Sequence, residues 1–573
     1  MNTITLLSAV ALTVGTLTPG LCAQEPAVAQ APAAEVQITA RAFKDIGALA
    51  QEYKSRNYDR FENATGIFGR KGETLRVRVN GQPAAPIHLL IHSFEDKTVN
   101  AETSIPLKAG DNTVTLPHEG LVYISYFTPD GQGKPVDITI TGGTDNCVYR
   151  KRDGARRAEQ LLRNPGSEYL DIVTDYTHLV YNKEGLLKHC PTNPEPLLAI
   201  YDDLIGDQFR TLGLFKYKRW YGNHMMGRNG IGGFMHADGL GAYYSKDSMG
   251  AVTDVNKLDY WAIAHEFGHV NQINPGLRWH GTGETTNNIF SMRARYKYTP
   301  GQLPLEDNPS SSIDGNMVCG CFNTLFHGAI INGEPFRFQL GPSNLRDYAK
   351  GGDVFVSIVP FWQLELYYNM AGMGSNKDFY PDLCEKLRLD PSEPKLTPGE
   401  SQVRFCCYAC DVAGENLIPY FEKVGLLKEV DRAIGDYGDG RITITPEMIA
   451  QAREYGKKYK APASPVIHLI SSHSLDAFRN RLPVQGSANI GVTPGTDSIT
   501  IDNGAWKNVV AYYTYAGNKL IRIALPGTGD ASGKTTRVAF PEEATRVEAV
   551  AWDGQTRGVY ERPTHAPSTT QQH

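Results

Sequence analysis

The chain has 573 residues, enough for about three or four domains of ordinary size. Its residues are 41% hydrophobic and 10% aromatic, which indicates an ordinary globular protein. The formal net charge of −5 argues against a nucleic-acid partner and against attraction to an anionic membrane surface.

Residues 1–23 have the features of a secretory signal peptide. Residues 6–17 form an apolar core, and Leu21-Cys22-Ala23 can serve as the cleavage site. We therefore expect a secreted, periplasmic or cell-surface protein. Lipoprotein anchoring at Cys22 is the alternative, but Pro19-Gly20-Leu21 makes a poor lipidation context. No other apolar run reaches the length of a transmembrane segment.

The next part of the chain predicts a linker followed by strands. Residues 24–40 are rich in Ala and Pro and are typical of a flexible linker. Residues 41–149 are assigned to an N-terminal β-sandwich region that begins with a short helix at residues 42–54. The predicted strands, separated by Gly, Asp and Pro turns, are residues 75–79, 87–92, 113–116, 122–127 and 136–140.

Residues 150–460 are rich in helical patterns and form the predicted central domain. A Pro-containing linker at residues 461–465 follows, and strand patterns return over residues 466–562, which predicts a C-terminal β-sandwich. That sandwich can bind glycan or brace the central domain, and the lack of a clustered aromatic platform in its sequence favours bracing. Residues 563–573 are expected to be disordered.

The segment around residue 265 carries most of the chemistry. His265 and His269 are four residues apart, so they lie on one face of the helix predicted over residues 258–273. There they can offer two imidazole nitrogens to one metal ion, and Glu266 can reach a water on that metal. The alternative is a buried helix that carries two histidines without a metal. Buried polar groups need partners, however, and a metal supplies them.

A catalytic zinc ion usually has three protein ligands and one open position. Glu284 is the expected third ligand, because Thr282 can cap a second helix that begins near Glu284. His280, in the loop before that helix, competes for this role. Asn288 lies one turn after Glu284 and can either orient a ligand or be a solvated helix residue.

These residues carry a resemblance to a known family. His265-Glu266-x-x-His269 followed by GETTNNIFS at residues 283–291 resembles the zinc-binding core of the family that groups viral enhancins with bacterial mucin-degrading peptidases. The resemblance continues in NATGIF at 63–68 with KGE at 71–73, GFMHA at 233–237, PFWQL at 360–364 and DFYP at 378–381, and covers roughly residues 55–460. It implies a gluzincin fold, one catalytic Zn2+ ion, and cleavage of heavily O-glycosylated proteins such as mucins.

The expected fold class is therefore α+β, with a gluzincin-type helical zinc metallopeptidase domain flanked by two β-sandwich domains. The expected reaction is peptide hydrolysis, with His265, His269 and Glu284 as metal ligands and Glu266 as the general base for the zinc-bound water. A further donor should stabilise the oxyanion, and the sequence does not choose between His236 and the downstream tyrosines.

Two alternatives to a mucin-type O-glycopeptidase stay open. One is a broad secreted zinc peptidase that is indifferent to glycans, and the other is a glycan-binding protein with an idle peptidase core. Trp220, Tyr221 and Trp279 are candidates for stacking on a sugar near the site, although packing in the core is the favoured interpretation for any single one of them.

The remaining motifs predict structural roles. Cys319-Gly-Cys321 and Cys406-Cys407-x-x-Cys410 match no common structural zinc pattern, so buried thiols or one or two disulfides are expected. The segment at residues 435–440, Gly-Asp-Tyr-Gly-Asp-Gly, lacks the ligand spacing of an EF-hand and predicts a turn before a strand at Ile442.

Overall fold

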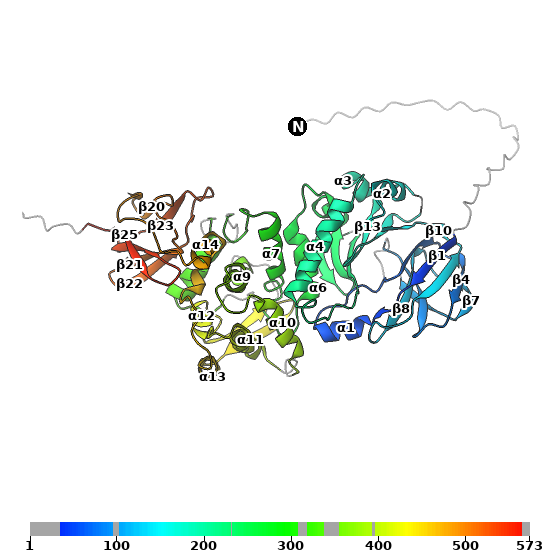
Figure 1. Ribbon diagram of the computed structural model, residues 1–573, viewed down its shortest axis with the longest axis horizontal. Coiled ribbons are helices and arrows are strands. Elements are labelled where there is room, and N and C mark those ends of the chain that lie inside the picture. Colours follow the sequence, from blue (N-terminus) through cyan, green and yellow to red (C-terminus); the bar gives the residue numbers. More distant parts are fainter. Residues whose placement is uncertain are drawn as a thin grey trace, which may run out of the picture.

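The structure of this chain is a computed structural model that describes residues 35–94, 102–164, 166–230, 232–307, 318–336, 354–391 and 396–563. The predicted signal peptide and residues 564–573 of the predicted tail lie outside the described residues. Figure 1 shows strands at both ends of the long axis and a helical part between them, which is the α+β architecture expected from the sequence. Among the described residues, no helix is both long and apolar enough to cross a membrane.

The N-terminal part is a sandwich of two sheets. Its elements are β1 (Glu35–Ala40), β2 (Phe43–Lys44), α1 (Ile46–Tyr53), β3 (Ala64–Gly69), β4 (Thr74–Asn80), β5 (Ile87–His92), β6 (Glu102–Leu107), β7 (Gly110–Thr115), β8 (Gly120–Thr128), β9 (Val136–Thr141) and β10 (Thr144–Asp145). One sheet has the order β1-β9-β4-β7 and the other β10-β3-β8-β5-β6, with β2 added beside β8. Side chains of β4 alternate between buried and exposed, because one face of the strand packs on the core between the sheets.

The first strand corrects the predicted domain boundary. β1 lies inside the segment assigned to the linker and pairs with β9 along its whole length, from Glu35 opposite Thr141 to Ala40 opposite Val136. Its sequence, EVQITA, alternates polar and apolar residues, so it contained a strand signal that the Ala- and Pro-rich composition around it obscured.

The central part combines one mixed sheet with a large set of helices. The strands are β11 (Val148–Arg150), β12 (Tyr169–Val173), β13 (Thr177–Asn182), β14 (Met225–Gly230), β15 (Met235–Asp238) and β16 (Gly241–Ser245), in the order β11-β12-β13-β14-β16-β15. β15 is therefore an edge strand, and it runs antiparallel to β16. The helices are α2 (Ala155–Leu162), α3 (Lys183–His189), α4 (Glu195–Thr211), α5 (Met249–Thr253), α6 (Tyr260–Asn271), α7 (Asn288–Tyr298), α8 (Gly320–Leu325), α9 (Val354–Glu365), α10 (Phe379–Leu389), α11 (Pro398–Ala413), α12 (Ile418–Lys423) and α13 (Pro446–Gly456). A hairpin of β17 (Val430–Gly435) and β18 (Asp439–Ile444) lies between α12 and α13, as the turn predicted at residues 435–440 requires.

The C-terminal strands form two small sheets, β19-β20-β23 and β22-β21-β24-β25, around a core of their own. Their bounds are β19 (Val492–Pro494), β20 (Ser498–Asp502), β21 (Ala511–Ala516), β22 (Lys519–Ala524), β23 (Thr535–Ala539), β24 (Arg546–Val550) and β25 (Thr556–Glu561). The segment assigned to the start of this sandwich is instead helical, with η6 (Ile467–Leu469), η7 (Ser472–Ser474) and α14 (Leu475–Arg479). Ile467, Leu469 and Phe478 pack in the central core, because a short apolar run can serve a buried helix as well as a strand.

Buried charges join the sandwich to the central sheet. His178 of β13 lies between two carboxylates: its Nδ1 is 2.8 Å from Oδ2 of Asp59, and its Nε2 is 3.0 Å from Oδ1 of Asp171. Tyr123 of β8 donates to the same oxygen of Asp171 at 2.7 Å. Burial alone lowers the pKa of His178, but the two carboxylates raise it to about 10, so the ring is an imidazolium at neutral pH.

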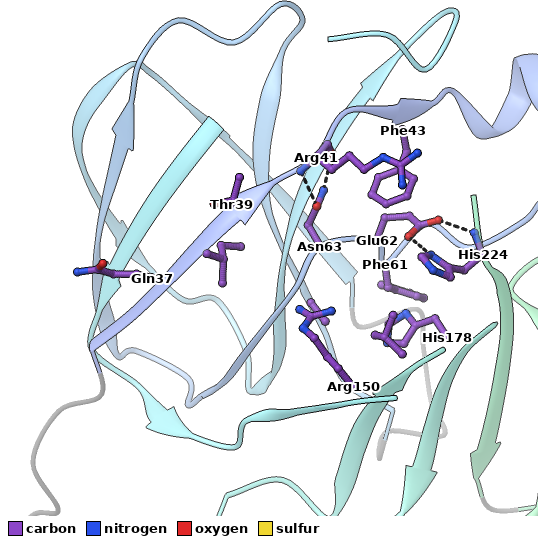
Figure 2. Close-up of a pocket in the computed structure, with 13 residues that line it drawn as sticks. Gln37, Thr39, Arg41, Phe43, Phe61, Glu62, Asn63, Arg150, His178 and His224 are labelled. Carbon is purple, nitrogen blue, oxygen red and sulfur yellow. Dashed lines mark hydrogen bonds and ion pairs between the residues drawn. The ribbon is translucent and has the colours of Figure 1, made fainter. Parts of the chain in front are cut away.

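A second pair lies beside this triad. Figure 2 shows Glu62 accepting from both the backbone N–H and the ring Nδ1 of His224, at 2.8 and 2.7 Å. Glu62, His178 and His224 line a groove of about 460 Å³ between the sandwich and the central sheet. The two parts of the chain are thus held together by buried, hydrogen-bonded histidine–carboxylate pairs.

We expect His178→Asn to lower the free energy of unfolding by about 3–5 kcal/mol, because Asp59 and Asp171 then stay buried without their cation. The pKa of His178 is higher in the folded state than the ordinary histidine value of 6.5, so its stabilisation is full below pH 6.5 and is lost as pH rises through about 10. Denaturation midpoints measured across this range should fall more steeply with pH in the wild type than in the variant. His118→Asn, on the rim of the same sandwich, is the control, and equal slopes in His178→Asn and wild type would contradict the assignment.

Candidate metal centre

The helix that carries both histidines is α6. It begins at Tyr260 because the side chain of Asp259 accepts from the N–H of Ala262 at 3.1 Å, and it ends where Gln272 becomes extended. The helix predicted over residues 258–273 is confirmed. α6 packs against α4, α7 and the strands β15 and β16, so most of its surface is buried, including Glu266 and His269.

Three donor atoms meet on one side of α6. Nε2 of His265 lies 3.1 Å from Nε2 of His269, and Oε2 of Glu284 lies 3.2 Å and 3.3 Å from these two nitrogens. His280 is not part of this group. The ring of His280 packs on the β17–β18 hairpin, directly against Gly440. A Cβ added at Gly440 would lie 2.3 Å from Nε2 of His280.

The donor set fits a zinc ion. Zinc bound tetrahedrally at about 2.0–2.1 Å holds its ligand atoms about 3.3–3.4 Å apart, and the three measured separations are close to this value. The other ring nitrogen of His265, Nδ1, donates to Oδ1 of Asn288 at 2.7 Å. This hydrogen bond fixes the tautomer in which Nε2 carries the free lone pair, as a metal-binding histidine requires.

The two glutamates differ in charge state. Burial raises the pKa of Glu266 to about 7, partly opposed by His265. Burial also acts to raise the pKa of Glu284, but hydrogen bonds from His265 and His269 hold it well below its ordinary value. The same contacts raise the pKa of His265 against the effect of burial, whereas burial lowers the pKa of His269. Glu284 is therefore a carboxylate, and Oε2 of Glu266 is buried without a hydrogen-bond partner among the described residues.

The second helix begins later than expected. The sequence predicted a helix from Glu284 with Thr282 as its cap, but α7 starts at Asn288, and the hydroxyl of Thr282 instead bonds to the backbone of Trp279. Glu284 lies in a run of tight turns before the helix. The turns arise because Thr285 and Thr286 both donate their N–H to the carbonyl of Thr282. Asn288, the first residue of α7, is buried and bonds to the ring of His265, so it is not the solvated helix residue that was one of its two interpretations.

Gly268 sets the distance between α6 and α7. A Cβ at this position would lie 2.8 Å from the carbonyl oxygen of Asn287 and 3.1 Å from the ring of Phe290. Asn287 itself is fully buried, and its Nδ2 lies 3.2 Å from Nε2 of His269. The absence of a side chain at Gly268 therefore lets the Glu284 turn approach the histidine face.

A cavity of about 560 Å³ opens over the donor atoms. The edge strand β15 forms one wall, and Arg56 from the N-terminal part reaches in and donates to the carbonyl of Ala237. His236 also lines the cavity; its ring stacks on Tyr243 with centroids 4.3 Å apart, and its side chain is 47% exposed. An edge strand beside a metal-type site is suited to bind an extended peptide by strand addition.

The aromatic residues named from the sequence lie elsewhere. Trp279 is buried and packs in the core, where its Nε1 donates to Gln402 at 3.1 Å. It therefore has a structural role and does not stack on a sugar. Trp220 packs against Tyr176, and Tyr221 donates to Glu52 at 2.9 Å. None of the three lines the cavity.

The sequence did not identify three cavity residues, Arg56, Arg278 and Tyr437. They come from a loop after α1, a loop after α6 and a hairpin, and no local motif marks them.

The eight cysteines from Cys147 to Cys410 form no disulfides, so the disulfide alternative is wrong and the buried-thiol alternative is confirmed for most of them. Among the described residues, the single group of three or more His, Cys, Asp or Glu side chains suited to a metal consists of His265, Glu266 and His269. Glu284 joins the two histidines through its separations of 3.2 and 3.3 Å.

Two family models match consecutive parts of the sequence. The model for Peptidase M60, enhancin and enhancin-like, matches residues 158–425, and the model for the N-terminal domain of M60-like peptidases matches residues 29–141. No curated protein sequence matches the chain.

Among solved structures, a metallopeptidase in complex with Tn antigen superposes with a TM-score of 0.74 at 21% identity, covering 91% of this chain and 98% of the other. A metallopeptidase from Bacteroides thetaiotaomicron gives 0.73 at 20% identity over 91% and 89%. The M60 catalytic domain of Clostridium perfringens ZmpC, in complex with the sialyl T antigen, gives 0.63 at 15% identity over 91% and 100%.

The structural similarity extends over the N-terminal, central and C-terminal parts together, so it concerns the whole architecture and not the metal cluster alone. With two models of one peptidase family matching consecutive parts of the sequence, as its motifs predicted, the chain belongs to the M60 family of enhancin-like peptidases.

Proposed function

We propose that this protein is a zinc metallopeptidase that hydrolyses peptide bonds in mucin-type O-glycosylated proteins. The observation that carries the proposal is the meeting of three donor atoms at 3.1–3.3 Å beside the unpartnered carboxylate oxygen of Glu266. His265, His269 and Glu284 would hold the ion. Zinc bound there would supply a Lewis acid that acidifies a water molecule and polarises the scissile carbonyl.

Glu266 is the proposed proton carrier. It adjoins His265 in the sequence and lines the same cavity, yet it is not one of the three closely spaced donors. Its carboxylate takes a proton from the attacking water and delivers it to the nitrogen of the leaving amine, so that the peptide bond and one water molecule become a carboxylic acid and an amine. The edge strand β15 supports the proposal by offering backbone groups that can align the substrate chain.

The glycoprotein substrate is the finer part of the proposal. Two of the similar structures contain Tn antigen and sialyl T antigen, which are O-linked glycans. Within the cavity, Arg56, Arg278 and His236 supply polar groups that can bind hydroxyls. A broad peptidase indifferent to glycans, and a glycan-binding protein with an idle core, are the alternatives that the experiments below separate.

Glu266→Gln is expected to abolish hydrolysis while the protein keeps its zinc and its fold. The replacement keeps the shape of the side chain but removes the base, and a lost general base costs at least about 10²–10⁴-fold in rate. Zinc content and circular dichroism are the controls. Substantial turnover by the zinc-loaded variant would refute the role of Glu266.

Glu284→Ala is expected to weaken zinc binding strongly, because only two protein ligands remain. His280→Ala should leave the zinc content unchanged, since the ring of His280 lies against Gly440 and away from the cluster. Metal analysis of the two purified variants checks the ranking, and the reverse order would show that the third ligand is misassigned.

The enzyme is expected to cleave an O-glycosylated peptide much faster than the same bare peptide. Polar groups arranged to bind a sugar lose their partners when the sugar is missing, which lowers kcat/KM sharply. Rates on the two peptides provide the comparison. Equal rates would support the broad peptidase, and binding of both peptides without cleavage of either would support the idle core.

A further inference from the structure

Glu284 is held by a loop and not by a helix. It lies four residues before α7, in the turns between Thr282 and Asn288. A loop carboxylate moves more freely than one on a helix, yet Glu284 lies within 3.3 Å of both histidines. The surroundings of the loop must therefore restrict it.

The first restraint is Asp436, at the tip of the β17–β18 hairpin. Its Oδ2 accepts from the backbone N–H of Gly281 and of Gly283, both at 2.9 Å. Asp436 is 5% exposed, and a Cβ at Gly283 would fall 2.3 Å from its Oδ1. The carboxylate therefore lies directly against the loop on both sides of Thr282, where charge-assisted hydrogen bonds are short and strong.

The second restraint is Tyr437, the next residue. Its hydroxyl donates to Oε1 of Glu284, 153 residues away in the sequence, while Oε2 of the same carboxylate faces the two histidines. The two oxygens of Glu284 thus have separate partners. A carboxylate held in this way can give a metal one oxygen and not two, which leaves one position of a four-coordinate ion open.

The backbone of Tyr437 has an uncommon conformation for a bulky residue. Its φ is 56°, in the left-handed region, where a bulky side chain is a true outlier. Such a conformation is unfavourable and persists only where the surroundings impose it, typically at functional sites. The side chain is also 62% exposed, so burial in a core does not account for this conformation.

We infer that Asp436 and Tyr437 are positioning residues, through which the β17–β18 hairpin fixes the Glu284 loop and presents a single carboxylate oxygen to the metal. The inference rests on the proposed role of Glu284 as a metal ligand. Neither residue touches the two histidines in the structure, so both act through Glu284.

The test measures zinc affinity of the full chain, by competition with a chromophoric chelator, in Tyr437→Phe and Asp436→Asn. Both variants are expected to bind zinc about 10–100-fold more weakly than the wild type, the usual effect of losing a group that orients a ligand.

Tyr437→Asn is a third variant. Asn tolerates the left-handed backbone but should bind zinc as weakly as the Phe variant.

The matched control is Thr443→Val on the same hairpin, where the hydroxyl bonds only to Asp431 on the exposed side. It should bind zinc like the wild type. The unfolding temperature of the metal-free protein should be the same in Tyr437→Phe and Thr443→Val. If the hydroxyl of Tyr437 only stabilised the fold, Tyr437→Phe would instead unfold at a lower temperature.

Glu284→Ala distinguishes a failure of the positioning inference from a failure of the ligand assignment. If it loses zinc while Tyr437→Phe and Asp436→Asn bind zinc like the wild type, the positioning inference is overturned and the proposed function stands. If Glu284→Ala itself keeps wild-type affinity, the ligand assignment fails and the inference fails with it.

Discussion

The contact between Gly268 and the backbone of Asn287 is the constraint on which the metal cluster depends. Because residue 268 has no side chain, α6 can pack closely against the turn before α7. A Cβ at this position would lie 2.8 Å from the carbonyl oxygen of Asn287. Two imidazoles and a carboxylate then lie within 3.3 Å of one another in a largely buried place. Such an arrangement is costly unless the groups share a partner, so the close packing of the two elements creates a place that suits a metal ion.

The features that the sequence predicted are those set by local physics. Asp259 caps α6 through its own side chain, and the four-residue spacing places His265 and His269 on one face. The start of α7 was predicted four residues too early, because Thr282 bonds to Trp279 instead of capping. Glu284 nevertheless lies beside both histidines, because its position depends on the turns before α7 and not on a helix.

Other features depend on contacts that no local pattern carries. Trp279 is buried by Gln402 and Phe405, more than a hundred residues away, so its exposure was not readable from its neighbours. Tyr437 lies in a segment that the sequence correctly predicted to be a turn, yet nothing there indicates that its hydroxyl meets Glu284. Long-range packing decides both cases, and it is the information a single sequence lacks.

The N-terminal sandwich is also part of the site. Past α1, the chain pairs with the end of the metal-type helix: the carbonyl of Lys54 accepts from the N–H of Asn274, and the N–H of Arg56 donates to the carbonyl of Val270. Arg56 then enters the cavity. Since the His178 triad bonds the same sandwich to the central sheet, loss of the sandwich would remove Arg56 from the cavity and two hydrogen bonds from the end of α6. The cavity is thus a product of parts that separate family models describe, and the sandwich cannot be a mere appendage to the peptidase.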